Sequence, residues 1–329
     1  MRIKDRMTNF PTASISTVIQ LIIDDTRVFR EVAELGNELA HLGNQLIGAE
    51  TKARIGIIFD WDNYWALEYT SGPTVDLYYV DQIQRYYETL YHNQVAVDII
   101  PVDADFEQYD MILAPVLYMV KKGTAEKLEQ FVAKGGTFLT SFMSGIVDQS
   151  DNVHLGGYPG PLRKLLGIWV EEIDALAPEK RNTVEFGSRD CNKPSYECSM
   201  LCDLLHLEGA EAIAEYKSDF YKGMPAVTKN SFGKGEAWYL ATLPEKEMLQ
   251  EIIDHLLKEK NIVGFGVQPE GIEITSRVKD GKEFIFVMNH TDEAQTVANS
   301  FVGYEDILSS AEGTEELLLE PFGVRIYTK

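Results

Sequence analysis

The sequence of 329 residues is poor in cysteine and in basic residues, and it has no long apolar run. Its three cysteines, Cys191, Cys198 and Cys202, are an odd number for so large a chain, which favours reduced thiols in a cytoplasm over a disulfide framework. Lys and Arg total 30 against 52 Asp and Glu, and the net charge of −22 repels phosphate backbones and anionic lipids. Nucleic acid and membranes are therefore not expected partners, and no stretch is long enough to span a bilayer.

The first 23 residues do not have the pattern of a secretion signal. Basic residues precede a mildly apolar run, but Ser16, Thr17 and Gln20 interrupt that run, and no small-residue cleavage site follows it. We therefore treat residues 1–23 as an atypical N-terminal segment of a cytoplasmic protein.

Motifs for nucleotides and for nucleophilic catalysis are also missing. No GxGxxG or Walker loop follows a predicted strand, so no nucleotide cofactor is expected. Ser144 in TSFMSGIVD follows a strand as a nucleophile would, but Phe142 stands where a nucleophile elbow needs glycine. A hydrolase or amidotransferase that uses Ser144 is therefore the least favoured alternative.

Metal binding has one candidate. Cys198, Cys202 and His206 are spaced by four and would line one face of a helix as zinc ligands. The same stretch also has the pattern of a strand, which would scatter these side chains, and buried thiols among leucines are usually structural. We therefore expect no metal site.

The pattern of apolar residues changes along the chain. Residues 24–47 have apolar residues at spacings of three and four, which predicts a long connector helix capped by Asp24 or Asp25. From Lys52, strands alternate with helices, which predicts an α/β fold with a flavodoxin-like or glutamine-amidotransferase-like, mostly parallel sheet and helices on both faces. The predicted strands are 55–59, 95–99, 111–114 and 137–141, and the predicted helices are 76–92 and one that Thr124 caps.

Residues 170–239 are less regular, with strands predicted near 210–216, 226–230 and 237–241, and Pro244 is expected to start a helix that runs to Leu257. Beyond Asn261, short strands flank Asp280–Gly281, a strong hairpin signal, and predict a small antiparallel all-β domain. The expected division is residues 1–23, a connector at 24–50, an α/β domain at 51–262 and a β domain at 263–329.

The first predicted strand runs into an acidic and aromatic stretch, GIIFDWDNYWALE. A sheet of this type holds ligands at the C-terminal ends of its strands, where we expect loops at 60–65, 115–118 and 142–145. Carboxylates beside aromatic rings suit a sugar site, and glycoside hydrolysis needs two carboxylates that flank the bond. The residues in question are Asp60, Trp61, Asp62 and Trp65.

Other interpretations compete with a sugar site at these four residues. Asp60 and Asp62 point to opposite sides if the strand continues, and their side chains can instead cap the turn. The only Asn–Glu pair, Asn37–Glu38, lies in the connector helix and suits a solvated face. We therefore favour structural or interface contacts at these residues, with sugar contacts as the alternative.

A dense block of aromatic residues surrounds this stretch. Such residues can stack on sugars, but they more often form cores and subunit contacts. Together with a connector helix, the block favours assembly. Its members are Trp61, Tyr64, Trp65, Tyr78, Tyr79, Tyr86, Tyr87 and Tyr91.

Five strings resemble the C-terminal half of glycoside hydrolase family 42 β-galactosidases: TRVFREVAELGNEL, IGIIFDWDNYWALE, YYETLYHNQVAVDIIP, FVAKGGTFLTSFMSGIVDQSDNVHLGGYPGPLRKLLGI and SDFYKGMPAVTKNSFGKGEAWYLAT. The resemblance covers about Asp24 to Lys329. Enzymes of this family have a TIM barrel with both catalytic glutamates, then an α/β trimerisation domain, then a small antiparallel β domain. The resemblance thus implies a trimerisation domain at 52–261, a C-terminal β domain at 264–329 and a helix that leads out of the barrel.

The departure from the family is large, because the sequence shows no barrel. Neither catalytic glutamate can be assigned to a residue here, and the family's barrel-borne cysteine zinc site has no counterpart in the three cysteines. Residues 1–23 do not resemble barrel sequence, and we expect them to be a newly started N-terminus on a truncated or split gene. No catalytic, cofactor or metal residue is therefore assigned.

Two classes of function follow. The favoured one is an assembly subunit of a β-galactosidase that self-associates, as a trimer, or docks with a separate barrel chain, without hydrolysing galactosides alone. The alternative is a sugar-binding module that holds a galactoside in the crevice near Asp60, Trp61 and Trp65.

Overall fold

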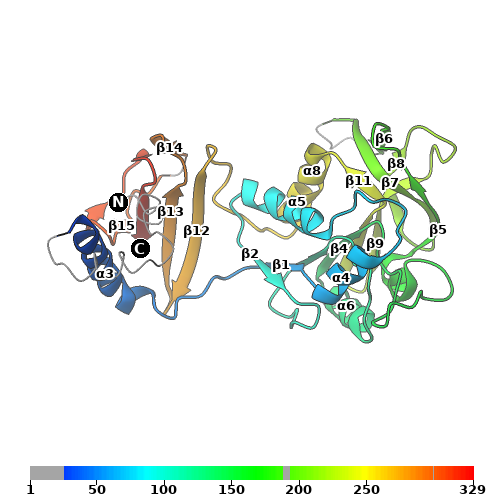
Figure 1. Ribbon diagram of the computed structural model, residues 1–329, viewed down its shortest axis with the longest axis horizontal. Helices are drawn as coiled ribbons and strands as arrows, with labels where there is room; N and C mark the ends of the chain where they lie inside the picture. The colour runs from blue at the N-terminus through cyan, green and yellow to red at the C-terminus, as the bar shows by residue number, and fades with distance from the viewer. Residues whose placement is uncertain (1–25, 188–192, 299) are drawn as a thin grey trace. The chain divides into compact units, whose positions relative to one another are not determined.

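The computed structural model describes residues 26–187, 193–298 and 300–329. The predictions for residues 1–23, Asp24, Asp25 and Cys191 lie outside this part of the chain. The chain divides into two units, shown in Figure 1. As far as the structure describes these ranges, the α/β unit takes Ala53–Tyr91 and Val97–Val263, and the β unit takes 26–52, His92–Ala96 and Gly264–Lys329.

The centre of the α/β unit is a set of parallel strands. The strands β1 (Ile55–Ile58), β3 (Met111–Ala114) and β4 (Thr137–Ser141) are buried at every residue. On either side, β2 (Val97–Ile100) and β10 (Gly235–Leu240) extend them in parallel, in the order β2-β1-β3-β4-β10. Because both faces are covered, the central strands are largely continuous apolar runs. This arrangement confirms the α/β prediction.

Beyond β10 the same sheet is antiparallel. In the described residues it has 11 strands and continues as β9-β8-β6-β7-β11, with β5 also paired to β7. Tight turns such as Gly233–Lys234, between β9 and β10, can join only antiparallel strands, so the sheet as a whole is mixed. The bounds are β5 Ile168–Ala175, β6 Asn182–Phe186, β7 Ser195–Leu207, β8 Glu211–Tyr216, β9 Pro225–Phe232 and β11 Thr242–Pro244.

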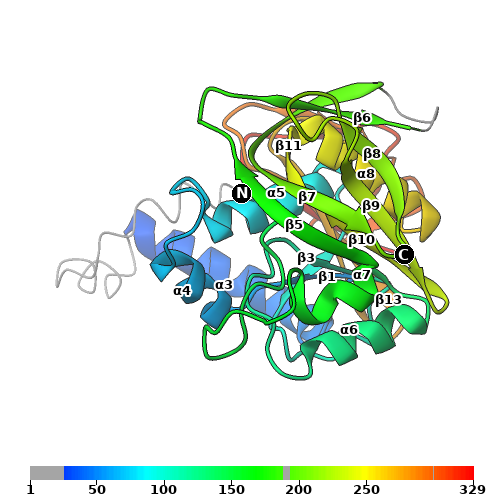
Figure 2. The same cartoon turned by 90° about the vertical axis from the view of Figure 1, so that its right-hand side faces the viewer.

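Helices cover both faces of the sheet, as predicted. On one face, Trp238 of β10 contacts His255, with ring centroids 5.8 Å apart. On the opposite face, Asn230 of β9 donates a hydrogen bond to the Leu165 carbonyl. The helices α5 and α8 lie together on the first face, and α6 and α7 on the second (Figure 2). Their bounds are α5 Tyr79–His92, α6 Thr124–Ala133, α7 Arg163–Leu166, after a 3-10 turn at Gly160–Leu162, and α8 Lys246–Glu259.

Several element boundaries differ from those predicted. Pro244 ends β11, and α8 begins only at Lys246, so the prediction that Pro244 starts this helix is wrong. A proline is tolerated there because β11 lies at the edge of the sheet. The helix predicted from Asp76 begins at Tyr79, and the strand predicted at 95–99 lies at Val97–Ile100.

The β unit is a small antiparallel structure, as predicted. Its main sheet has the order β12-β13-β18-β15-β16, and β14 pairs with β17 beside it. The turn between β12 and β13 is Asp280–Gly281, where both residues have positive φ, as a tight hairpin requires. The bounds are β12 Ile272–Lys279, β13 Lys282–Asn289, β14 Gln295–Val297, β15 Glu305–Asp306, β16 Ala311–Glu312, β17 Leu317–Leu319 and β18 Val324–Thr328.

The predicted connector helix is α3 (Arg27–Leu46), and it belongs to the β unit. Its cap is Thr26, whose hydroxyl accepts a hydrogen bond from the Phe29 N–H at 3.2 Å. Near its C-terminal end, Leu42 and Leu46 pack against a small cluster in the β unit. The members of that cluster are Phe284, Ile307 and Ile326.

A second distant segment also joins the β unit. Gln94 is buried, and its amide group bonds the backbone of β12 in two directions. Its Oε1 accepts from the Ile274 N–H at 2.7 Å, and its Nε2 donates to the Ile272 carbonyl at 3.4 Å. Residues 92–96 thereby close onto the strand that begins some 180 residues later.

Across the described ranges, no helix combines the length and the apolar character that crossing a membrane requires.

Candidate functional site

The stretch after β1 is a helix, so the prediction of a loop at 60–65 is wrong. The strand ends at Ile58, and α4 runs from Trp61 to Tyr69. Asp60 occupies the N-cap position, but its side chain makes no capping bond. The helical turn instead directs Asp60 and Asp62 to the same cation.

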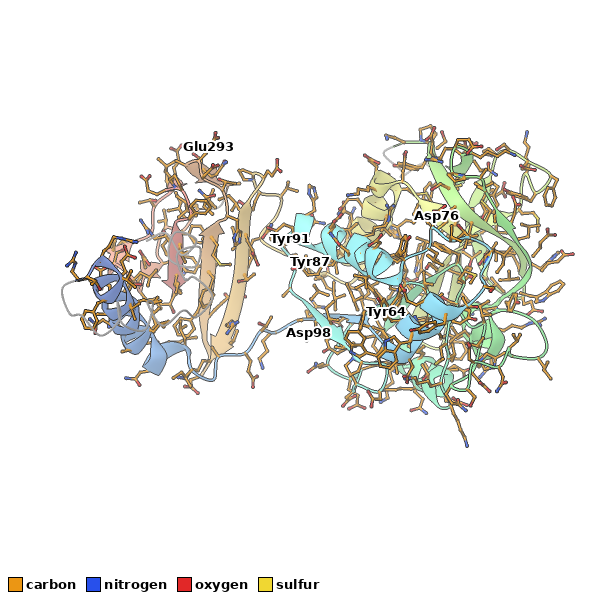
Figure 3. All side chains as sticks on the ribbon, viewed as in Figure 1. Tyr64, Asp76, Tyr87, Tyr91, Asp98 and Glu293 are labelled. Carbon is orange, nitrogen blue, oxygen red and sulfur yellow. The ribbon has the colours of Figure 1, made fainter. Side chains whose placement is uncertain are left out.

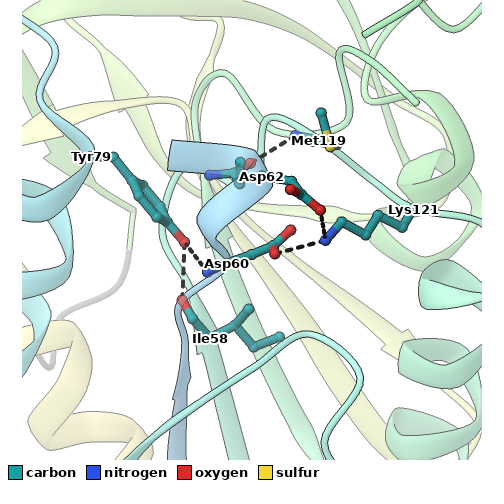
Figure 4. Close-up of polar contacts among 7 residues, drawn as sticks. Ile58, Asp60, Asp62, Tyr79, Met119 and Lys121 are labelled. Carbon is teal, nitrogen blue, oxygen red and sulfur yellow. Dashed lines mark hydrogen bonds and ion pairs between the residues drawn. The ribbon is translucent and has the colours of Figure 1, made fainter. Parts of the chain in front are cut away.

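That cation is Lys121, in the segment after β3. Its Nζ lies 2.7 Å from Asp60 Oδ1 and 2.6 Å from Asp62 Oδ2 (Figure 4). Partial burial disfavours the charge on Lys121, but hydrogen bonds and attraction from the two carboxylates outweigh this effect and raise the pKa of Lys121. Asp60 is buried, and its Oδ2 has no hydrogen-bond partner among the described residues. Both acids are thus paired with the same lysine.

Polar side chains tie this edge of the sheet together. Asn63 is fully buried; its Nδ2 donates to the Val116 carbonyl at 3.0 Å, and its Oδ1 accepts from the Met119 N–H at 2.8 Å. Ser144 is also buried, and its hydroxyl accepts from the Leu117 N–H at 3.0 Å. These contacts give Ser144 a structural role and support the sequence argument against a nucleophile there.

The tryptophans of α4 face outward. Trp61 is 60% exposed and Trp65 is 52% exposed, and their ring centroids lie 6.0 Å apart. The Trp61 ring packs edge-on against the Phe59 ring, with the ring centroids 5.0 Å apart. The pair therefore forms an apolar platform whose position is fixed by the helix and the strand end.

Helix α5 divides the predicted aromatic block into two groups. Tyr79 and Tyr86 are buried in the core, and the Tyr79 hydroxyl donates to the Ile58 carbonyl at 3.2 Å (Figure 4). On the same helix, Val80 is 47% exposed and Tyr87 is 40% exposed. Helix α5 thus has a second apolar face that packing within the unit does not explain.

A shallow hollow of about 330 Å³ lies between α4 and the start of α5. Figure 3 shows Tyr64 on α4, and Tyr87 and Tyr91 further along α5. We call the exposed apolar set around the hollow the aromatic surface; it consists of Trp61, Trp65, Tyr69, Tyr78, Val80 and Tyr87. The hollow itself is lined by Tyr64, Glu68, Tyr78, Tyr79, Val80 and Asp81.

A larger hollow of about 1130 Å³ lies between α8 and strands β8, β9 and β10. Its lining is more acidic than basic, with Glu211, Glu251, Asp254 and Glu259 against Lys229, Lys258 and His255. The His255 ring lies 3.4 Å from Glu259, and Lys229 lies 3.8 Å from Glu236, over the ring of Trp238.

The candidate metal ligands lie on a strand. Cys198, Cys202 and His206 all belong to β7, and the two thiols are buried, whereas His206 is exposed. His206 stacks on Trp169 and contacts Glu171 at 2.5 Å. Among the described residues, no group of three or more His, Cys, Asp or Glu side chains could hold a metal ion.

One buried acid had no signal in the sequence. Asp203 on β7 is fully enclosed and accepts a hydrogen bond from the Tyr239 hydroxyl at 2.5 Å. Burial raises the pKa of Asp203 to about 7, against the lowering effect of that hydrogen bond. Lys121 was missed as well, because only the turn into α4 brings it to Asp60 and Asp62.

Comparison with known proteins agrees with this geometry. Residues 53–263 match the family described as "Beta-galactosidase trimerisation domain", and residues 271–329 match "Beta-galactosidase C-terminal domain". The chain is 49% identical over 307 residues to β-galactosidase BgaP of Planococcus sp. (strain L4), covering 93% of this chain and 45% of that protein. It is 45% identical over 294 residues to β-galactosidase LacZ of Lactobacillus acidophilus, covering 89% of this chain and 43% of that protein.

Solved structures show the same relation. The β-galactosidase of Bacillus circulans sp. alkalophilus superposes with a TM-score of 0.88 at 43% identity, over 93% of this chain and 46% of that one. That of Rahnella sp. R3 has a TM-score of 0.82 at 39% identity, over 93% and 45%. The chain thus spans a little less than half the length of the relatives that it matches. It belongs to the glycoside hydrolase family 42 β-galactosidases, of which it carries the trimerisation domain and the C-terminal domain.

Proposed function

We propose that this chain is the assembly part of a β-galactosidase and that it does not hydrolyse galactosides by itself. The observation that carries this proposal is the aromatic surface, because it places two tryptophans and three tyrosines in solvent, on α4, on α5 or next to them. Contiguous exposed apolar patches mark interaction sites, and Trp and Tyr dominate the energetics of subunit contacts. The family match to a trimerisation domain supports a homotrimer as the product of this contact.

The partner is either further copies of the same chain or a chain that bears a catalytic barrel. The family resemblance places both catalytic glutamates in the barrel, which the matched domains do not include. The four-part division predicted from the sequence and a cytoplasmic location remain part of this proposal. The parent reaction is the hydrolysis of terminal β-galactosides with retention, and this chain contributes assembly to it.

Light scattering of the purified chain tests self-association directly. We expect a mass three times that of one chain, and a monomer for the double variant Trp61→Asp, Trp65→Asp. Each tryptophan is worth about 2 kcal/mol or more at the centre of an interface, so the two together cost at least a hundredfold in affinity. The matched control is Phe220→Asp, because Phe220 is 70% exposed but lies between β8 and β9, away from α4 and α5.

A monomeric wild-type chain, alone and after mixing with a candidate barrel chain, would contradict the assembly function. The claim of inactivity has a separate test with a chromogenic β-galactoside. Cleavage by the purified chain that a single carboxylate substitution abolishes would overturn it.

A sugar-binding module is the second candidate. The exposed Trp61 and Trp65 rings and the hollow next to α4 are the elements that such a module uses. Titration with galactose and lactose, followed by tryptophan fluorescence, separates this candidate from pure assembly. Saturable binding that Trp65→Ala removes would support it, and the absence of saturation would eliminate it.

A further inference from the structure

Two cysteines of β7 face the same short stretch of a neighbouring strand. Cys202 pairs with Thr242 of β11, and Cys198 pairs with Pro244, so four residues of β7 advance only two residues along β11. The register shifts between these pairs, and Met200 between the two cysteines has a φ of 67°, which marks a bulge in β7.

The bulge shortens the distance between the two cysteines. Residues four apart on a regular strand are separated by about 13 Å, whereas residues two apart are separated by about 6.6 Å. We infer that Cys198 and Cys202 approach the second spacing, because they lie opposite residues two apart on β11. A disulfide spans Cα separations of about 4.4–6.8 Å, and residues two apart present their side chains on the same side of a strand.

The two thiols also interact with each other. Their mutual hydrogen bond lowers the pKa of Cys202, although burial opposes this effect, and the same bond together with burial raises the pKa of Cys198. The Cys202 Sγ lies 3.6 Å from Thr242 Oγ1, which adds a further partner for its sulfur. The directions of the two shifts favour Cys202 as the thiol that ionises first.

We propose that Cys198 and Cys202 form a dithiol that a small hydroperoxide oxidises to a disulfide within β7, across its bulge. Nothing in the assembly function requires these thiols, and no metal or catalytic role competes for them among the described residues.

The chemistry balances with hydrogen peroxide as the oxidant. The Cys202 thiolate attacks one peroxide oxygen, the O–O bond breaks, and the hydroxide that leaves takes up a proton to become water. The sulfur of Cys198 then attacks the sulfenic sulfur of Cys202, the S–O bond breaks, and the Cys198 proton leaves with the oxygen as a second water. The two thiols lose two electrons, and the peroxide accepts both.

Access to the pair favours a small oxidant. Both thiols are buried, but one side of the pair is covered by β11, which has three residues and lies at the edge of the sheet. Short edge elements open locally at lower free energy than core strands. Hydrogen peroxide is close to water in size, so we expect it to react sooner than bulky disulfides such as oxidised glutathione.

Mass spectrometry of the full chain decides the proposal. After peroxide treatment at pH 7, we expect the intact mass to fall by about 2 Da, because two hydrogens are lost. After alkylation, we expect a Cys198–Cys202 crosslink in the peptide map. Of the three thiols, only Cys191 should then be alkylated in denaturant, and dithiothreitol should restore the other two. Three alkylated thiols under conditions that oxidise free glutathione, or a crosslink to Cys191, would overturn the proposal.

Single variants test which thiol attacks. In Cys198→Ser, the sulfenic acid of Cys202 has no resolving thiol and should be trapped by dimedone, whereas Cys202→Ser should give about tenfold less adduct. Equal trapping would overturn the role given to Cys202. Cys191→Ser is the matched control and should leave the crosslink unchanged. If a serine variant does not fold, the wild-type peptide map still decides whether the disulfide forms.

Discussion

Asp60 and Asp203 are both buried carboxylates of the α/β unit, and the fold accommodates them in opposite ways. Asp60, at the end of β1, is paired with the Lys121 ammonium group at 2.7 Å. Asp203, inside β7, has a phenol as its partner, and burial raises its pKa to about 7. At the end of a strand, a long cationic side chain can reach in from solvent and pair with the acid. Within a strand, the buried acid is instead kept neutral because it keeps its proton.

The two carboxylates therefore have different effects: the Asp60 pair fixes a surface, and the protonation of Asp203 changes only the stability of the interior. At the edge, the ion pair sets the start of α4 and so fixes the direction of Trp61 and Trp65. In the interior, the protonation of Asp203 changes the free energy of unfolding but presents nothing to solvent. The four predictions below test this distinction. All four tryptophans lie in the α/β unit, so their fluorescence reports its unfolding.

The largest expected effect comes from Asp203→Asn. The folded protein keeps the proton of Asp203 up to a pKa of about 7, whereas the unfolded chain loses it near the usual value of 3.8. The folded state thus binds more protons between these values, so this residue's contribution to stability is full below pH 4 and falls as pH rises to 7. The variant lacks this fall. Urea unfolding at pH 4 and pH 8 should show its advantage over wild type growing by about 4 kcal/mol. A constant difference between the two proteins would refute the raised pKa.

Next in size is Lys121→Ala, which leaves Asp60 buried without its cation. We expect the free energy of unfolding at pH 7 to fall by about 2–3 kcal/mol, because an uncompensated buried charge is costly. Urea denaturation followed by fluorescence measures this change. The control is Lys134→Ala, since Lys134 makes an exposed pair with Glu107 and its loss should leave stability unchanged. Equal effects of the two variants would show that the Asp60 pair is no different from a surface pair.

A smaller effect is expected from Tyr239→Phe, which removes the hydroxyl that donates to Asp203. Losing this hydrogen bond should raise the pKa of Asp203 further, because the bond favours the ionised form. The unfolding free energy at pH 8 should fall by about 1–2 kcal/mol. In a pH series, the midpoint of the stability loss should move above that of wild type. A midpoint that moves downward would mean that the hydroxyl stabilises the neutral acid instead.

The smallest effect is expected from Asp62→Asn. Asp62 shares Lys121 with Asp60, but its side chain is largely exposed, and water screens such a pair. The expected loss is below about 0.5 kcal/mol and should vanish at high salt. Repeating the urea titration in 1 M NaCl checks this. A loss as large as that of Lys121→Ala would show that both acids, rather than Asp60 alone, depend on the lysine.

The overall fold was predictable because the central strands are short apolar runs between helices with clear periodicity. The α/β class and the antiparallel β unit both follow from such patterns. Helix α4 was missed for a physical reason: its buried residue is the polar Asn63, whereas Trp61 and Trp65 are exposed, so WDNYWALEY has no apolar stripe that faces the core.

The site was predictable in position but not in detail. Asp60, Trp61, Asp62 and Trp65 do lie together at the strand end, and whether they bind a sugar or a subunit remains a prediction. Lys121 could not be found from the sequence, because its partners lie some 60 residues earlier in the chain. The bulge in β7 was equally hidden, since a non-glycine residue such as Met200 gives no warning of a positive φ.

The way Gln94 bonds β12 has a consequence for anyone who would exchange the α/β unit between relatives. Cutting the chain at residues 52 and 263 removes the α/β unit in one piece. The same cut also removes His92–Ala96, which belongs to the β unit. The recipient would then lose the side-chain amide that bonds the Ile272 carbonyl and the Ile274 N–H. A working chimera must therefore carry a segment equivalent to His92–Ala96 that fits the recipient's β12, or keep the recipient's own five residues at this position.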